Sequence, residues 1–259
     1  MSIAENIAQI QQRIAQAALG ASRQPSEIAL MAVSKTMPAE RIREAFAAGQ
    51  RLFGENRVQE FQAKYAELSL ASPASLASAV SAAVKPITAA TMDEVSSIAG
   101  ARFHLIGHLQ SNKAAKAAEL FHSVDSVDSL RLAERLEAAA ASLHKTLRIL
   151  LEINVGGEQA KSGVEPDSAE LLRILQAVPR LPHLEIGGLM TVPPFTEDPE
   201  GSRPYFRRLR ELRDRLAMQT KLDLPELSMG MSHDFEVAIE EGSTCVRIGT
   251  AIFGARPQP

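Results

Sequence analysis

The hydrophobic and polar positions of the chain repeat in a way that predicts helices and strands in regular succession. Residues 2–19 predict an amphipathic helix, because Ile3, Ile7 and Ile10 recur at the spacing of one helix face. Residues 28–33 form a continuous apolar run, which is typical of a strand that is buried on both faces, as in a parallel sheet. Most of the chain alternates between these two patterns.

The two patterns predict eight strands with helices between them. The predicted strands are residues 28–36, 51–56, 103–106, 121–124, 147–153, 184–190, 226–229 and 244–248. The predicted connecting helices are residues 39–48, 57–68, 111–120, 127–143, 167–177, 205–217 and 234–240. This alternation, with loops of ordinary length, predicts an α/β fold that is a single (β/α)8 TIM barrel with an extra N-terminal helix.

One helix of the barrel is incomplete in this reading. Only residues 249–259 follow the last strand, so we expect the helix at 2–19 to cover the surface that a full eighth helix would cover. The alternative architecture is an open doubly wound sheet. No G-x-G-x-x-G motif follows a predicted strand, which argues against the dinucleotide-binding form of that fold.

Composition narrows the class of protein. The chain of 259 residues is 45% hydrophobic and 23% charged, as in ordinary soluble globular proteins. Its net charge of -3 argues against a nucleic-acid or anionic-membrane partner. The single cysteine, Cys245, excludes an intrachain disulfide and suits a reducing compartment. Because there is no signal-peptide pattern and no long apolar run, we expect a cytoplasmic protein.

Residues 69–100 differ in composition from the rest. Between Ser69 and Ala90 more than half of the residues are alanine or serine, and Pro73 and Pro86 interrupt any helix. We expect a low-complexity surface insertion, mobile or partly helical, within one domain that spans residues 1–259. We assign it no chemistry.

Lys35 is the first candidate for chemistry. It stands where the buried strand ends and a βα loop begins, and catalytic and ligand groups gather at that rim of an α/β barrel. Desolvation lowers the pKa of an amine, and a neutral amine attacks aldehydes and ketones. The alternative is a lysine that only extends its charged head into water.

Two late loops are suited to an anion. Ser228, Met229 and Ser232 belong to the segment 228–232, which joins the seventh strand to the next helix, and Gly249 and Thr250 follow the eighth strand. Small residues let backbone N–H groups approach a phosphate, and these two loops are the usual phosphate position in such barrels. Ordinary turn chemistry is the alternative for either loop alone.

A lysine near a phosphate site suggests a phosphorylated aldehyde. Pyridoxal phosphate is the commonest such cofactor, and an aldolase that holds a sugar phosphate on its lysine is the other candidate. Arg247 lies two residues before Gly249, so its side chain should point into the barrel, where it could meet the pyridine nitrogen. An arginine cannot give that nitrogen a proton, and the ring then remains a weak electron sink.

Other polar residues have weaker claims. Asn56 either hydrogen-bonds a ring substituent or caps the helix that follows it. His104 and His108 lie across a strand end and a loop, so we expect no metal site there. The basic cluster at 207–215 reads as a solvated helix face, with a docking surface as the minority alternative.

Several motifs together resemble one known family. They are Ala-Val-Ser-Lys-Thr at 32–36, Phe-Gly-Glu-Asn-Arg-Val-Gln-Glu at 53–60, His-Leu-Ile-Gly-His-Leu-Gln-Ser-Asn-Lys at 104–113, Leu-Met-Thr at 189–191, Leu-Ser-Met-Gly-Met-Ser-His-Asp at 227–234 and Val-Arg-Ile-Gly-Thr-Ala-Ile-Phe-Gly at 246–254. In combination they are specific, and they resemble the pyridoxal phosphate homeostasis protein family. The resemblance covers nearly the whole chain apart from about residues 69–100.

The resemblance implies a barrel like the N-terminal domain of alanine racemase, with pyridoxal 5'-phosphate held by Lys35 as a Schiff base. The other contacts that it implies are Ser232, Gly249 and Thr250 at the phosphate, Arg247 at the pyridine nitrogen, Asn56 beside the ring and Met190 near the cofactor face. Two features depart from the family pattern. The segment between Glu67 and Phe103 is longer than usual, and Met37 stands where some members carry a second lysine.

Three functions remain open from the sequence. The first is a non-catalytic carrier or regulator of pyridoxal phosphate, as the family is regarded, which acts as a monomer and passes the cofactor to apo-enzymes. The second is an amino-acid racemase such as alanine racemase. It is opposed because racemases use a tyrosine from a second domain, which we expect to be absent here, and Tyr65 and Tyr205 lie on predicted helices. The third is a lysine Schiff-base aldolase, for which the rim offers only Glu55 and Asp125 as acid–base partners.

Overall fold

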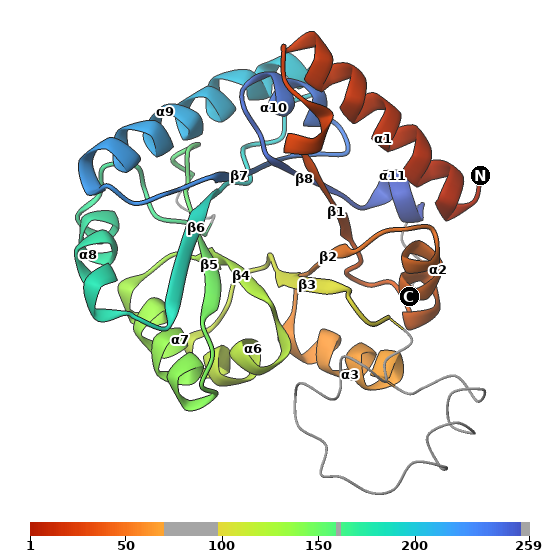
Figure 1. The fold of residues 1–259 in the computed structure, drawn as a ribbon. Helices are drawn as coiled ribbons and strands as arrows, with labels where there is room; N and C mark the ends of the chain where they lie inside the picture. Colours follow the sequence, from red (N-terminus) through yellow and green to blue (C-terminus); the bar gives the residue numbers. More distant parts are fainter. Residues whose placement is uncertain (70–97, 159–161, 255–259) are drawn as a thin grey trace, which may run out of the picture.

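Eight parallel strands pair in sequence order and close into a barrel, which confirms the predicted fold (Figure 1). The computed structural model describes residues 1–69, 98–158 and 162–254. The strands are β1 (Ala29–Val33), β2 (Leu52–Glu55), β3 (Arg102–Leu105), β4 (Ser123–Val127), β5 (Leu147–Glu152), β6 (Leu184–Met190), β7 (Glu226–Met231) and β8 (Cys245–Ile248). Residues 70–97 of the predicted insertion lie outside the described part of the chain.

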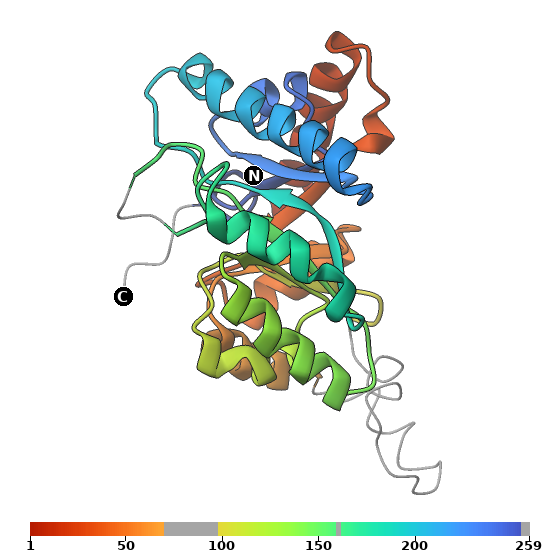
Figure 2. The ribbon, with the colours of Figure 1, turned by 90° about the vertical axis from the view of Figure 1, so that its left-hand side faces the viewer.

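Helices cover the outside of the barrel, as two views at right angles show (Figure 1 and Figure 2). The helices are α1 (Ile3–Gly20), α2 (Ala39–Ala47), α3 (Val58–Ser69), α6 (Ala114–Leu120), α7 (Leu130–Ser142), α8 (Ala169–Ala177), α9 (Arg203–Thr220), α10 (Phe235–Glu240) and α11 (Thr250–Phe253). Short 3-10 helices lie at Pro25–Glu27, Ser111–Lys113, Val178–Arg180 and Pro199–Ser202. Within the described residues, no helix combines the length and the apolar character that crossing a membrane requires.

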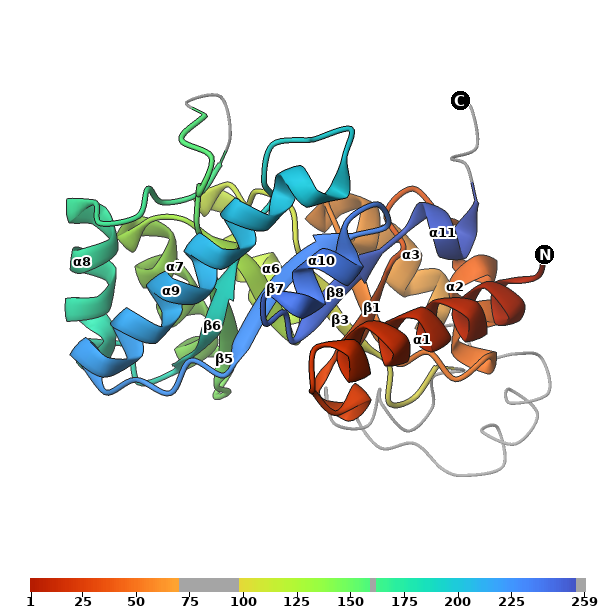
Figure 3. The same ribbon diagram turned by 90° about the horizontal axis from the view of Figure 1, so that it is seen from above.

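The N-terminal helix closes the side of the barrel where the last helix is short. The isoleucines of α1 are buried, and the helix packs against α10, α11 and α2 (Figure 3). Asn6 Nδ2 donates a hydrogen bond of 2.8 Å to the carbonyl oxygen of Ile252 in α11. At the start of α1, Ser2 and Glu5 form a capping box, which satisfies two backbone N–H groups. The expected role of α1 as a cover is therefore confirmed.

The apolar core lies between the sheet and the helices. Part of it is a group of four phenylalanines from β2, β3, α3 and the end of α6. The ring centroids of Phe61 lie 4.6 Å from Phe103 and 4.7 Å from Phe121, and Phe53 stacks on Phe103 at 5.3 Å. Burying rings of this size supplies a large share of the hydrophobic stabilisation of such a core.

The inside of the barrel is unusually polar. His104, Ser123, Asp125, Ser228 and Arg247 are all buried, and they hydrogen-bond to one another across neighbouring strands. Their sequence neighbours on the same strands belong instead to the apolar core under the helices. Since successive side chains of a strand face opposite sides, these polar residues line the interior of the barrel.

The predicted boundaries are wrong at β4. The strand was expected at 121–124 but spans Ser123–Val127, because Phe121 ends α6 and packs outside the barrel. Asp125 and Ser126 were expected at the rim, yet both lie within the strand and are fully buried. Their polar groups have hydrogen-bond partners there. Asp125 Oδ2 bonds to His104 Nδ1, and the Ser126 hydroxyl donates to the Gly107 carbonyl.

Candidate functional site

Lys35 lies at the carboxyl end of β1, as the sequence predicts, and is half-buried. The N–H of Ser34 still donates to the Gly54 carbonyl of β2 at 3.0 Å, and the N–H of Met37 turns back to the Ser34 carbonyl. Thr36 has a left-handed backbone with φ 64°, which few residues other than glycine adopt. Lys35 is therefore held in a tight, defined turn between β1 and α2.

A buried ionic cluster supports this turn from below. Lys64 of α3 donates to both carboxylate oxygens of Glu55, at 3.0 and 2.9 Å, and to the Ser34 carbonyl at 2.9 Å. It also pairs with Glu60 at 2.9 Å, and Glu60 accepts from the Thr36 N–H. Burial raises the pKa of Glu55, and the charge of Lys64 acts against that rise. The cluster ties both sides of Lys35 to α3 and β2.

Arg247 enters the barrel from β8, as the sequence predicts. Its Nη1 donates to the carbonyl and hydroxyl oxygens of Ser228, at 2.6 and 2.8 Å, and its Nη2 donates to the Thr191 carbonyl at 2.7 Å. Burial lowers the pKa of the guanidinium. The three hydrogen bonds that Arg247 donates, to Ser228 of β7 and to Thr191 just after β6, fix the plane of its guanidinium. Arg247 pairs in register with Met31 of β1, the strand that leads to Lys35.

The two predicted anion loops are neighbours at the same end of the barrel. After β7, the Met231 N–H donates to Asp234 Oδ1 at 2.7 Å, which closes a turn around the half-buried Ser232. After β8, Gly249 lies beside Val33, since a Cβ on this glycine would sit 3.4 Å from the Val33 side chain. Thr250 begins α11, where the first backbone N–H groups have no partner within the helix.

Asn56 and Met190 lie at the carboxyl end of the barrel, where Lys35 also lies. The side chain of Met229 does not point to this site. Asn56 follows β2 and packs against Gly107, where a Cβ would meet the Asn56 carbonyl at 2.2 Å. Capping of α3 by Asn56 is wrong, because the first helical hydrogen bond runs from Phe61 to the Arg57 carbonyl. Met190 ends β6 and faces the interior, whereas Met229 packs in the core under the helices.

Glu152 is a site residue that sequence reasoning missed. It ends β5, pairs in register with Met190, and is buried with its Oε2 lacking a hydrogen-bond partner in the described residues. Burial and, to a smaller extent, the charge of Asp128 raise its pKa to about 7, against the opposing charge of Arg247. A lone carboxyl at the end of the apolar run 147–153 was the signal available, since buried glutamates are rare.

The raised pKa of Glu152 predicts a pH-dependent stability of the cofactor-free protein. The folded state binds this proton more tightly than the unfolded chain, so stability falls as pH rises from about 4.5 to about 7 and then levels off. Glu152→Gln should remove this loss, which makes the variant more stable than the parent by up to about 3 kcal/mol at pH 8 and equal to it at pH 4.5. Denaturant unfolding at both pH values measures the free energy of unfolding. The same change in this free energy between the two pH values for parent and variant would contradict the prediction.

The remaining candidates are accounted for by local pairs. His104 bonds Asp125 inside the barrel, whereas His108 pairs with Asp128 at 3.3 Å near the carboxyl end of β4. Among the described ranges, no three histidine, cysteine or acidic side chains are grouped as a metal site requires. On α9, four arginines of the 207–215 cluster form ion pairs, two of them with Glu241, and Arg208 donates to the Val155 carbonyl at 3.0 Å.

Three comparisons relate the chain to known proteins. Residues 2–257 match the family described as "Alanine racemase, N-terminal domain". A pyridoxal phosphate homeostasis protein of Aquifex aeolicus is 41% identical over 256 residues, which cover 99% of each chain. The protein of the same description from Pseudomonas aeruginosa is 43% identical over 255 residues, which cover 98% of this chain and 96% of the relative.

Solved structures agree in fold. PipY of Synechococcus elongatus, solved with PLP bound, is 37% identical and superposes with a TM-score of 0.77 over 98% of this chain and 100% of its own. Alanine racemase of Corynebacterium glutamicum is 19% identical, with a TM-score of 0.60 over 99% of this chain and 61% of the racemase. At that identity, the racemase supports a common fold only.

Proposed function

The chain belongs to the pyridoxal phosphate homeostasis protein family, and on that premise we propose that it binds pyridoxal 5'-phosphate (PLP) through a Schiff base on Lys35 and buffers or delivers it without catalysis. The observation that carries the proposal is the meeting of three groups at one end of the barrel. They are the Lys35 turn, the Arg247 guanidinium and the loop at 249–250, on the neighbouring strands β1 and β8.

The groups at this end of the barrel match the chemical parts of the cofactor. The amine of Lys35 would condense with the aldehyde, which forms a C=N bond and releases water. Backbone N–H groups at Gly249 and Thr250, with the Ser232 hydroxyl, would hold the phosphate, as helix starts and small loops commonly do. Arg247 would face the pyridine nitrogen, and Asn56 and Met190 would border the ring. Ser228 acts by orienting Arg247, to which it is hydrogen-bonded.

Two features favour a carrier over a racemase. An arginine opposite the pyridine nitrogen does not protonate it, so the ring would stabilise a carbanion poorly. The chain has two tyrosines, and both pack against the apolar core from helices, Tyr65 on Phe61 in α3 and Tyr205 on α9. A general base must reach the proton that it removes. We propose further that the protein is a cytoplasmic monomer whose recipients are PLP-dependent apo-enzymes.

The proposed function predicts transfer of the cofactor without turnover of an amino acid. Protein loaded with PLP and then desalted should restore the activity of a PLP-dependent apo-enzyme, whereas Lys35→Ala treated in the same way should not. The same loaded protein, incubated with L-alanine, should form no D-alanine above the level of Lys35→Ala. Failure to reactivate the apo-enzyme would contradict delivery, and D-alanine formation that depends on Lys35 would favour the racemase alternative.

A further inference from the structure

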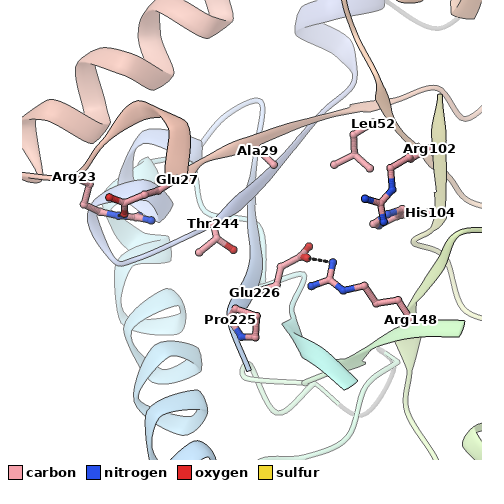
Figure 4. A pocket seen from close by; sticks show the side chains of 10 residues that line it. All are labelled: Arg23, Glu27, Ala29, Leu52, Arg102, His104, Arg148, Pro225, Glu226 and Thr244. Carbon is pink, nitrogen blue, oxygen red and sulfur yellow. Dashed lines mark hydrogen bonds and ion pairs between the residues drawn. The ribbon is translucent and has the colours of Figure 1, made fainter. Parts of the chain in front are cut away.

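The amino end of the barrel, opposite the Lys35 turn, holds a cavity of about 550 Å³ (Figure 4). Its walls come from the first residues of several strands and from the segments just before β1 and β8. Cavities of this volume are in the range that binds small molecules. A ligand here would lie at the far ends of the strands from the groups proposed to hold PLP, so the two sites would not compete.

The charged groups of this cavity leave one positive charge without a partner. Arg148 pairs with Glu226 at 2.5 Å, and Arg23 pairs with Glu27 at 3.2 Å. Arg102 also lines the cavity, and its guanidinium makes no ion pair or hydrogen bond within the described ranges. An arginine fork is suited to bind a carboxylate or phosphate through two parallel hydrogen bonds.

A buried histidine adds a second, independent sign of a ligand. His104 lines the cavity two residues after Arg102 on β3, and both side chains appear together at one wall (Figure 4). Its Nδ1 bonds Asp125 at 2.9 Å, and Asp125 is held in turn by the Ser123 hydroxyl. Its Nε2 is buried and has no hydrogen-bond partner among the described residues. Such atoms are rare in folded proteins, because leaving a polar atom buried and unbonded is costly.

The backbone of the cavity wall is shaped around Arg148. A Cβ added to Gly187 of β6 would lie 2.4 Å from Arg148 Nε, so any larger residue there would require the Arg148 guanidinium to move. The Arg148 guanidinium therefore lies beside Gly187 while its Nη1 donates to Glu226, as the dashed line in Figure 4 marks. This fixed pair forms one wall, and it leaves Arg102 and His104 as the groups with unused hydrogen-bonding capacity.

We propose that this cavity binds a small oxyanion, a phosphate or a carboxylate, through the guanidinium of Arg102 and Nε2 of His104. Because Asp125 is acceptor-only when ionised, Nδ1 carries a proton, and Nε2 accepts in the neutral ring and donates in the protonated ring. An oxyanion needs a donor, and the ring supplies one at Nε2 when both of its nitrogens carry a proton.

The test follows the ring resonance of His104 by NMR in the full chain loaded with PLP, with the signal assigned by its loss in His104→Gln. Sulfate, a phosphate mimic that does not titrate near neutral pH, and succinate are added separately, which distinguishes the two classes of oxyanion. The resonance is expected to shift and saturate with at least one of them. Arg102→Ala, with an unchanged thermal midpoint, should weaken binding about tenfold or more.

The matched control is Arg173→Ala, which removes an exposed arginine of α8 that pairs only with Glu170. It should bind as the parent does. Absence of a saturable shift with both anions would overturn the proposal, and so would equal affinity in the parent and Arg102→Ala. Because the readout is a histidine at the amino end of the barrel, its result does not depend on whether Lys35 holds PLP.

Discussion

Replacing Lys35 by alanine is expected to abolish the visible absorption band that PLP gives when it is bound to a lysine as a Schiff base. Under the proposed function this amine condenses with the aldehyde, and the nearby amine of Lys64 is engaged by Glu55, Glu60 and the Ser34 carbonyl. The proposed phosphate contacts at 249–250 remain in the variant, so PLP should still bind there, but reversibly and without the band. The measurement is the absorption spectrum of purified protein after incubation with PLP and desalting.

The control for this prediction is Lys116→Ala. Lys116 lies on the outside of the barrel in α6, where it pairs with Glu119 at 2.9 Å. Removing Lys116 should leave the absorption band unchanged. That result would show that the band does not arise from lysines at the protein surface. A Lys35→Ala protein that retains the full band would show that another lysine holds the cofactor.

Replacing Lys64 by alanine is expected to cost about 3–5 kcal/mol of folding free energy, the largest stability effect that the structure predicts. Glu55 is fully buried, and Lys64 is its only cationic partner within the described residues. Without the ammonium group, Glu55 must stay charged and unpaired or take up a proton. Since protonation becomes more costly as pH rises, the loss should be larger at pH 8 than at pH 5. Denaturant unfolding at the two pH values measures it.

Two further variants decide whether the unpaired carboxylate is the cause. Lys116→Ala breaks an exposed lysine–glutamate pair on α6 and should cost less than about 1 kcal/mol. Combining Lys64→Met with Glu55→Gln removes both charges and should recover much of the lost stability. A Lys64→Ala protein within 1 kcal/mol of the parent, or a double variant as unstable as the single one, would contradict this explanation.

The barrel was predictable because its signals are local and repeat eight times. β6 and β5 read as apolar runs bounded by polar loops, and their observed bounds lie within a residue of the prediction. β4 was misplaced because Asp125 and Ser126 look like loop residues. Asp125 can be buried in a strand because His104 of the neighbouring strand β3 hydrogen-bonds to it. Such a tertiary contact leaves no trace in local hydrophobic periodicity.

The candidate site was predictable to the extent that it depends on strand ends. Lys35, Arg247 and the loop at 249–250 were placed by counting strands around a closed barrel. The buried ionic cluster that holds the Lys35 turn was not predicted, because Lys64 lies in the middle of α3, where a lysine normally reaches solvent. The cavity at the amino end of the barrel was not predicted for a related reason. Arg102 is the first residue of β3 and Arg148 the second of β5, and only the closed barrel brings them to the same cavity.

The most direct test of the central claim identifies the lysine that holds the cofactor. Protein loaded with PLP is treated with borohydride, which converts the C=N bond to a stable single bond, and its peptides are analysed by mass spectrometry. The proposed function predicts one modified residue, Lys35, and no modification after borohydride in the Lys35→Ala variant. Modification confined to another lysine, or none in the loaded parent protein, would contradict the assignment of Lys35.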